Sequence, residues 1–142
     1  MKSLSWLPPL LLLIWFGSAR AELVVVVRAD SEIGALSRTE VTNIFLGRYR
    51  QLAGGAQAEP FDLPAGSPEH AAFYEALLNK TSAEIRAYWA RLIFTGRVAP
   101  PRTVDSGDRL VEQLLANPRA IGYLERQRLD RRLRIVHEPG GR

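Results

Sequence analysis

The chain has 142 residues, which suits one folded domain and no more. Its formal net charge of +4 at pH 7 is too small to indicate nucleic-acid binding by itself. The sequence contains no cysteine, which excludes disulfides and lipid attachment through a cysteine, so packing must stabilise the fold.

Residues 1–21 have the features of a cleaved signal peptide. Lys2 supplies a positive start, residues 4–16 form an apolar run, and residues 19–21 read Ala-Arg-Ala, a small-residue cleavage site. The run is shorter than the ~20 residues of a membrane-spanning helix and contains two prolines, but an uncleaved membrane anchor stays open as the alternative. Cleavage after Ala21 removes two basic residues and leaves a net charge of +2. We therefore expect an exported protein, most simply a periplasmic one in a Gram-negative bacterium.

Four apolar segments predict strands, at residues 22–28, 58–63, 120–124 and 133–137. The first is a continuous run of apolar residues, which is typical of a central strand buried on both faces. Because of Pro60, the second strand should lie at a sheet edge, or else Pro60 should be the first residue of that strand. Gly122 in the third indicates the close approach of another backbone.

Capping residues and helical periodicity predict four helices, which begin near Ser37, Ser67, Thr81 and Asp105 or Ser106. Capping boxes open the first helix, at Ser37–Glu40, and the third, at Thr81–Glu84. The first ends near Gly47, a candidate C-cap. The third is the most periodic, and its apolar stripe should face the core; it consists of Ile85, Tyr88, Trp89, Leu92 and Ile93.

The remaining segments predict connections. Residues 97–103 contain two adjacent prolines and should be extended, residues 125–132 form a basic turn or short helix, and residues 139–142 should fray. Strands that alternate with capped helices indicate an α/β domain over residues 22–138, with a mostly parallel or mixed sheet.

The turn before the second helix is the candidate binding site. Gly66 gives the turn backbone freedom, Ser67 occupies the N-cap position, and Pro68 follows at the first helical position. Such a helix start presents unpaired N–H groups and the positive end of the helix dipole, so it can hold an anion. The same arrangement also occurs as a plain helix cap, and the sequence leaves both roles open.

Catalytic and metal-binding patterns are missing. His70 and His137 are far apart and lack a ligand at metal-binding spacing, so we expect no metal site. Ser67 lacks the Gly-x-Ser-x-Gly context of a hydrolase nucleophile, and no phosphate-binding P-loop is found. We therefore predict a protein that is not an enzyme and needs no cofactor.

Arginine is concentrated near the C-terminus. We expect a solvated surface, because acidic residues interrupt the run. The alternative is a surface that docks on an acidic partner or on anionic lipid, with Arg128, Arg131 and Arg132 as docking residues. The whole group consists of Arg119, Arg126, Arg128, Arg131, Arg132 and Arg134.

Three segments together resemble a known family. Residues 36–47 read LSRTEVTNIFLG and resemble the Leu-Ser/Thr-x-x-Glu-Leu-x-x-Ile-Phe-x-Gly segment of phosphate-type (PstS-like) solute-binding proteins of ABC importers. Gly66 and Ser67, followed by Phe73, are similar to that family's Gly-Ser-Gly-Thr-x-x-x-Phe loop and helix. Residues 117–123 read NPRAIGY and resemble its Asn-Pro-Gly-Ala-Ile-Gly-Tyr segment.

The resemblance implies one lobe of a type 2 periplasmic-binding-protein fold, with Gly66 and Ser67 at the oxyanion site. Three positions depart from the family pattern: Leu63 replaces an arginine, Pro68 a glycine and Glu69 a threonine. Pro68 removes an N–H donor, and Glu69 brings a negative charge beside any bound anion. A like-charge pair at ~4 Å costs about 4 kcal/mol at an effective dielectric of ~20, whereas a helix N-terminus offers at most ~2 kcal/mol.

Two functional hypotheses follow. The first is an exported solute-binding-like protein for phosphate or a related oxyanion, in which a second copy or a partner completes the cleft. The second is a periplasmic interaction or signalling module that has the same lobe but binds no ligand.

Overall fold

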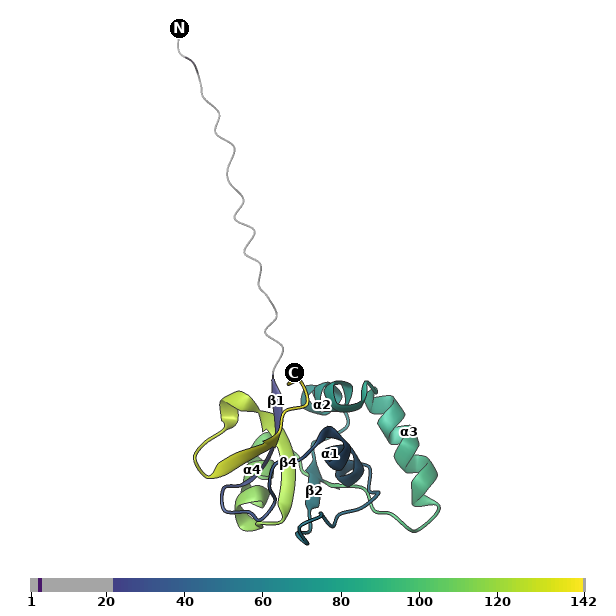
Figure 1. Cartoon of the computed structure of the whole chain (residues 1–142). Coiled ribbons are helices and arrows are strands. Elements are labelled where there is room, and N and C mark those ends of the chain that lie inside the picture. The colour runs from purple at the N-terminus through teal and green to yellow at the C-terminus, as the bar shows by residue number, and fades with distance from the viewer. Residues whose placement is uncertain (1–2, 4–21, 142) are drawn as a thin grey trace.

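The computed structural model describes residue 3 and residues 22–141 (Figure 1). The predicted signal peptide, residues 1–21, lies outside the described residues apart from Ser3. The strands are β1 (Leu23–Arg28), β2 (Glu59–Asp62), β3 (Arg102–Thr103), β4 (Ala120–Glu125) and β5 (Leu133–His137). The helices are α1 (Arg38–Phe45), α2 (Pro68–Leu78), α3 (Ser82–Ile93), α4 (Gly107–Ala116) and the 3-10 turn η1 (Arg126–Arg128).

The strands form one mixed sheet in the order β3-β2-β4-β1-β5. Strand β2 is parallel to both β3 and β4, whereas β1 is antiparallel to both β4 and β5. Helix α4 packs on one face of the sheet, and α1 and α2 lie on the other, with α3 outside them (Figure 1). The predicted α/β class with a mixed sheet is confirmed.

The interior of the sheet is apolar and aromatic. Residues 23–27 of β1 are all buried, as their unbroken apolar run predicts. The Tyr123 ring on β4 stacks on Phe73 of α2, with centroids 3.8 Å apart, and Phe45 of α1 meets Phe73 edge-on at 5.0 Å. These aromatic contacts fix α1 and α2 against the sheet, and α2 carries Ser67 at its start.

The edge position predicted for residues 58–63 is wrong. Strand β2 lies inside the sheet, and Pro60 is its second residue. Successive strand residues direct their N–H groups to opposite neighbours. Glu59 donates to the Arg119 carbonyl on the β4 side, so Pro60 faces the β3 side, where β3 pairs only from Phe61 onward. The missing N–H of proline therefore removes no ladder hydrogen bond.

Other predictions need smaller corrections. The extended connection 97–103 contains the edge strand β3. The close neighbour of Gly122 is a side chain, because a Cβ there would lie 2.7 Å from Leu110 Cδ1. On α3, Ile85 and Trp89 are buried as predicted, but Ile93 is 55% exposed because α3 extends past the rest of the domain.

Local capping agrees closely with the sequence. Both predicted capping boxes are present, at Ser37–Glu40 and Thr81–Glu84. Gly47 follows the α1 C-cap with φ +70°, a conformation that glycine adopts without strain. Pro139, in the segment predicted to fray, is buried, and its carbonyl accepts a hydrogen bond from Arg38.

Candidate functional site

Ser67 is the N-cap of α2. Its Oγ accepts a hydrogen bond from the His70 N–H at 3.2 Å and donates to the Pro64 carbonyl at 2.7 Å. The Ser67 N–H also donates to that carbonyl, at 2.8 Å. Because the hydroxyl has only one proton, it must rotate away from Pro64 before it can donate to a ligand.

Ser67 lies beside a cavity of about 340 Å³ that the sequence did not predict. The start of α2, the start of α4 and the end of η1 meet around it, although they are far apart along the chain. Its lining consists of Leu63, Pro64, Ser67, Glu69, Asp105, Ser106, Gly107, Leu124, Glu125 and Arg128. Gly66 is exposed in the adjoining turn. The cavity therefore joins two helix N-termini and one arginine.

The two helix starts supply backbone donors. Ser106 caps α4 by accepting from the Arg109 N–H at 3.2 Å, as Ser67 does on α2. Among the described residues, the first-turn N–H groups of Glu69, Gly107 and Asp108 have no acceptor. Unpaired N–H groups at helix starts, together with the helix dipoles, are a common means of holding an anion.

Arg128 contributes the cationic side chain of the cavity. Its Nη2 donates to Asp108 Oδ1 at 2.5 Å, and its guanidinium lies directly against Gly107, where a Cβ would collide with it. Only glycine at position 107 allows this approach. Arg128, one of the docking residues of the alternative interpretation, lines the cavity of Ser67, and its role in docking stays a prediction.

Carboxylates oppose these donors. Glu69, Asp105 and Glu125 line the same cavity, and Asp108 holds Arg128 in an ion pair. Each carboxylate that comes within ~4 Å of an anion would cost about 4 kcal/mol at an effective dielectric of ~20. The helix starts and Arg128 can therefore hold an anion only if the carboxylates turn outward or are protonated.

A buried polar cluster supports the turn from beneath. Asp62, the last residue of β2, is 6% exposed. Its Oδ2 accepts a hydrogen bond from the Tyr74 hydroxyl at 2.6 Å, its Oδ1 accepts one from the Tyr123 hydroxyl, and the Leu63 N–H donates to Oδ1 at 2.9 Å. These bonds join β2, α2 and β4, so the cluster fixes the position at which the chain leaves the sheet toward Ser67.

Burial dominates the ionisation of this cluster. It raises the pKa of Asp62, although hydrogen bonds from Tyr123 and Tyr74 and the nearby His70 act in the opposite direction. Burial, with the adjacent Asp62 charge, also raises the pKa of Tyr74 and of Tyr123. The two phenols therefore stay protonated and remain donors.

His70 closes the cluster on the α3 side. Its Nε2 lies 3.8 Å from Asp62 Oδ2, and its Nδ1 is 2.7 Å from Ser82 Oγ at the start of α3. Burial lowers the pKa of His70, the negative charge of Asp62 raises it, and Arg86 lowers it. The sequence did not identify this cluster; the available signal was a carboxylate at the end of a buried strand, directly before the turn.

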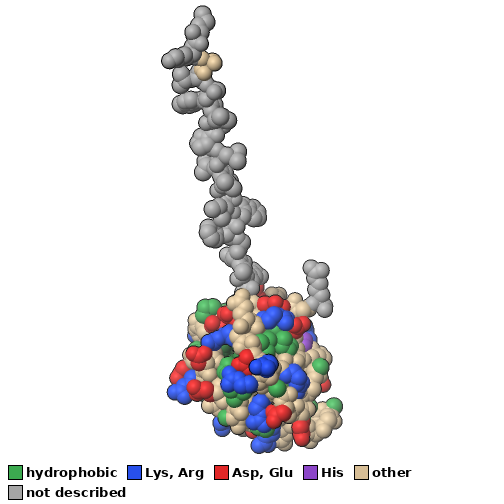
Figure 2. Space-filling view, turned by 90° about the vertical axis from the view of Figure 1, so that its left-hand side faces the viewer, with side chains coloured by type: hydrophobic (Ala, Val, Ile, Leu, Met, Phe, Trp, Pro, Cys, Tyr) green, Lys and Arg blue, Asp and Glu red, His purple; other side chains and the backbone are tan. Residues whose placement is uncertain are grey.

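The other arginines are largely paired. Arg132 Nη2 lies 2.7 Å from Asp130 Oδ2, and Arg126 pairs with both Glu22 and Glu138. Within residues 22–141, no ion pair is found for Arg131. The face that carries α4 shows blue and red side chains interspersed in Figure 2. This mixture does not form a continuous basic patch.

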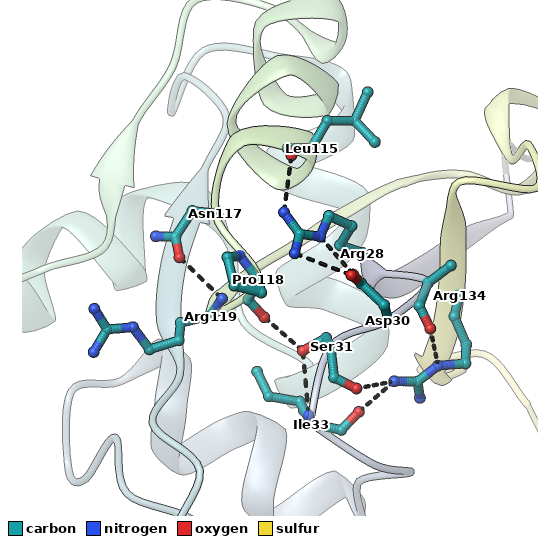
Figure 3. Close-up of polar contacts among 10 residues, drawn as sticks. Arg28, Asp30, Ser31, Ile33, Leu115, Asn117, Pro118, Arg119 and Arg134 are labelled. Atoms are coloured by element: carbon teal, nitrogen blue, oxygen red, sulfur yellow. Dashed lines mark hydrogen bonds and ion pairs between the residues drawn. The ribbon is translucent and has the colours of Figure 1, made fainter.

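The segment NPRAIGY has a structural role. Asn117 accepts a hydrogen bond from the Arg119 N–H at 2.9 Å, a local turn that starts β4. The Pro118 carbonyl accepts from Ser31 Oγ at 2.6 Å, while Arg134 donates to the carbonyls of Ser31 and Ile33 (Figure 3). The loop after β1 is thus tied to the start of β4 and to β5, and these polar groups satisfy one another.

Over the described residues, no helix is long and apolar enough to cross a membrane. In the same part of the chain, no three His, Cys, Asp or Glu side chains gather closely enough to hold a metal ion.

Comparison with known proteins identifies the fold. No protein-family model and no curated protein matches the chain. Among solved structures, it is similar to an ABC-type phosphate transport receptor from Vibrio cholerae, with 15% identity and a TM-score of 0.62 over 81% of this chain and 45% of that one. It is also similar to a substrate-binding protein from Clostridium perfringens with bound phosphate, with 17% identity and a TM-score of 0.65 over 84% of this chain and 45% of that one. The similarity to PstS from Borrelia burgdorferi has 17% identity and a TM-score of 0.54 over 72% of this chain and 40% of that one.

The chain thus spans less than half the length of each of these proteins. At such low identity the likeness concerns the fold, and the resemblance carried by the three sequence segments agrees with it. Residues 22–141 have the fold of about half of a phosphate-type substrate-binding protein of an ABC transporter.

Proposed function

We propose that this chain is an exported solute-binding-like protein that takes up a tetrahedral oxyanion such as phosphate in the 340 Å³ cavity at Ser67. The observation that supports it is the meeting of two capped helix starts with Arg128 in one cavity. The signal-peptide features of residues 1–21 support export to the periplasm. The similar proteins are receptors and substrate-binding proteins, which supports binding without catalysis.

The donors of the site define the ligand. The free N–H groups of Glu69, Gly107 and Asp108 and the rotated hydroxyl of Ser67 can donate to separate oxygens of a small anion. Arg128 can release Asp108 and turn to the anion, since both side chains are exposed. The surrounding carboxylates reduce the affinity, so we expect a dissociation constant near the millimolar range, about 4 kcal/mol of binding free energy.

Isothermal titration and thermal unfolding with phosphate, sulfate and molybdate test this function. Glu69→Gln should raise the affinity for phosphate by about tenfold because it removes one negative charge from the cavity; this is less than the ~4 kcal/mol of a pair ~4 Å apart, since the Glu69 carboxylate must turn outward for the anion to bind. Arg128→Gln should lower it by a similar factor, whereas the control Arg132→Gln, at an arginine paired outside the cavity, should leave it unchanged. If none of the three anions raises the unfolding temperature at ~10 mM, the proposed function is wrong, since binding to the folded state must stabilise it.

The second candidate is a periplasmic interaction or signalling module that binds no ligand. Two observations favour it: the Ser67 hydroxyl donates its hydrogen bond to the Pro64 carbonyl, and three carboxylates line the cavity. This candidate predicts a specific protein partner captured from periplasm, with capture reduced by charge reversal of Arg131 and Arg132. Capture that is unchanged by these reversals would exclude the arginine surface as the docking face.

A further inference from the structure

A groove that adjoins the Ser67 cavity, and shares Glu69 and Glu125 with it, runs along α2. It has a volume of about 590 Å³. Pro68, Ala72 and Ala76 lie four residues apart on one side of α2 and form its floor together with Leu23. Because Ala72 and Ala76 have small side chains, the floor leaves room for a large apolar side chain from outside.

The rim of this groove is acidic. Glu22, Glu69, Glu75 and Glu125 line it, and no Lys or Arg is among the described residues that line it. Arg126 neutralises Glu22 through an ion pair. Within the described part of the chain, three carboxylates therefore surround an apolar floor without a lining cation, and this combination favours an occupant with an apolar tip and positive charges beside it.

The end of α3 has this complementary chemistry. Phe94 is 93% exposed and Ile93 is 55% exposed, whereas large apolar side chains are usually much more buried. Arg91 and Arg97 flank them and are exposed. This apolar and basic tip, residues 91–97, lies at the lower right of Figure 1, whereas α2 lies at the top of the domain. A single copy therefore cannot place its own tip in its own groove.

We propose that the α3 tip of one copy docks in the α2 groove of a second copy. The Phe94 ring covers Ala72 and Ala76, and Arg91 and Arg97 approach the carboxylates of the rim. Every copy carries both surfaces, so two such contacts can close a pair. The contact surface is small beside the ~800 Å² per partner of a standard interface, and the association is correspondingly weak and concentration-dependent. This inference concerns assembly and does not rest on the oxyanion site, although Glu69 and Glu125 line both the groove and the Ser67 cavity.

Charge exchange tests the contact. Sedimentation velocity over a concentration series of the purified protein should show self-association. Glu75→Arg and Arg91→Glu should each weaken it by about tenfold, and the double variant should recover most of the loss because attraction is restored between copies. Phe94→Ser should abolish association without unfolding, as judged by circular dichroism, since this side chain packs little within its own copy.

The control is Arg131→Glu, which makes the same charge change on an exposed arginine away from the tip. A protein that is monomeric throughout the series overturns the proposal. So does association that withstands both single reversals, or that is lost in Arg131→Glu instead. Glu75 does not line the Ser67 cavity, so phosphate titration of Glu75→Arg reports separately on the proposed function.

Discussion

Removal of one phenol from the Asp62 cluster should destabilise the protein in a pH-dependent way. In Tyr74→Phe the ring stays in place, and Asp62 Oδ2 loses the hydrogen bond of 2.6 Å. Within the described residues no other hydrogen bond to this oxygen is found, and His70 Nε2 lies 3.8 Å away, too far for one. A hydrogen bond to a charged group contributes about 1.5–3 kcal/mol, and a neutral one about 0.5–1.5 kcal/mol.

The pH dependence follows from the raised pKa of Asp62. Between the unfolded value of 3.8 and the raised folded value, the folded state binds more protons than the unfolded state, so the contribution of Asp62 to stability falls as pH rises. In Tyr74→Phe the carboxylate loses a donor, which raises the pKa of Asp62 further. The loss of unfolding free energy should therefore be about 2 kcal/mol at about pH 7.5 and about 1 kcal/mol at about pH 4.

Urea unfolding at the two pH values measures both losses. Tyr88→Phe is the matched control, because the Tyr88 hydroxyl donates at 2.7 Å to a neutral acceptor, the Leu46 carbonyl. Its loss should be about 1 kcal/mol at both pH values. If Tyr74→Phe costs no more than Tyr88→Phe near neutral pH, or costs the same at both pH values, a charged Asp62 does not hold this cluster together.

Two further substitutions test packing and ionisation. Gly122→Ala should lower the free energy of unfolding by about 1–3 kcal/mol, because its Cβ would lie 2.7 Å from Leu110 Cδ1. The control Gly34→Ala has open space around it and should change stability by less than about 0.5 kcal/mol. Equal effects of the two substitutions in urea unfolding would contradict the packing at β4. Burial lowers the pKa of His70, so the unfolded state takes up the proton first and stability falls as pH drops below 6.5. The stability difference between wild type and His70→Gln should therefore shrink between about pH 7 and about pH 5, and a constant difference would show that His70 does not titrate in this range.

Local chemistry was predictable from the sequence where neighbouring residues decide it. The capping boxes at Ser37 and Thr81 depend on side chains three residues apart, and both were read correctly. The buried strand 22–28 was readable from its unbroken apolar run. Family-like segments then gave the fold, which the structural comparisons confirm.

Features that depend on distant segments were not predictable in this way. Pro60 is tolerated inside the sheet because the short β3 begins one residue later, and no local rule contains that information. The periodicity of α3 places Ile93 on the apolar stripe, but only the fold shows that no other described segment covers this end of the helix.

The candidate site was predictable only in part. Ser67 was identified from its own helix start and is confirmed as a cap. The meeting of that start with Ser106 and Arg128 results from the sheet order, which places α4 and η1 beside it. The Asp62 cluster likewise requires Tyr123 from β4, distant in sequence, to reach the end of β2. Anion-binding by Gly66 and Ser67 stays a prediction.

The position of β1 has a consequence for how the chain folds. Its hydrogen-bonding partners are β4 and β5, so the backbone of β1 stays unpaired on both edges until these later segments are present; Val25, for example, pairs with Tyr123 and His137. Closing such long loops is slow, and a sheet of this connectivity cannot form strand by strand while the chain is being synthesised. A polypeptide that cannot complete its sheet until the last segment is present stays unfolded for longer, and the apolar run of β1 remains exposed to chaperones and to aggregation during that interval.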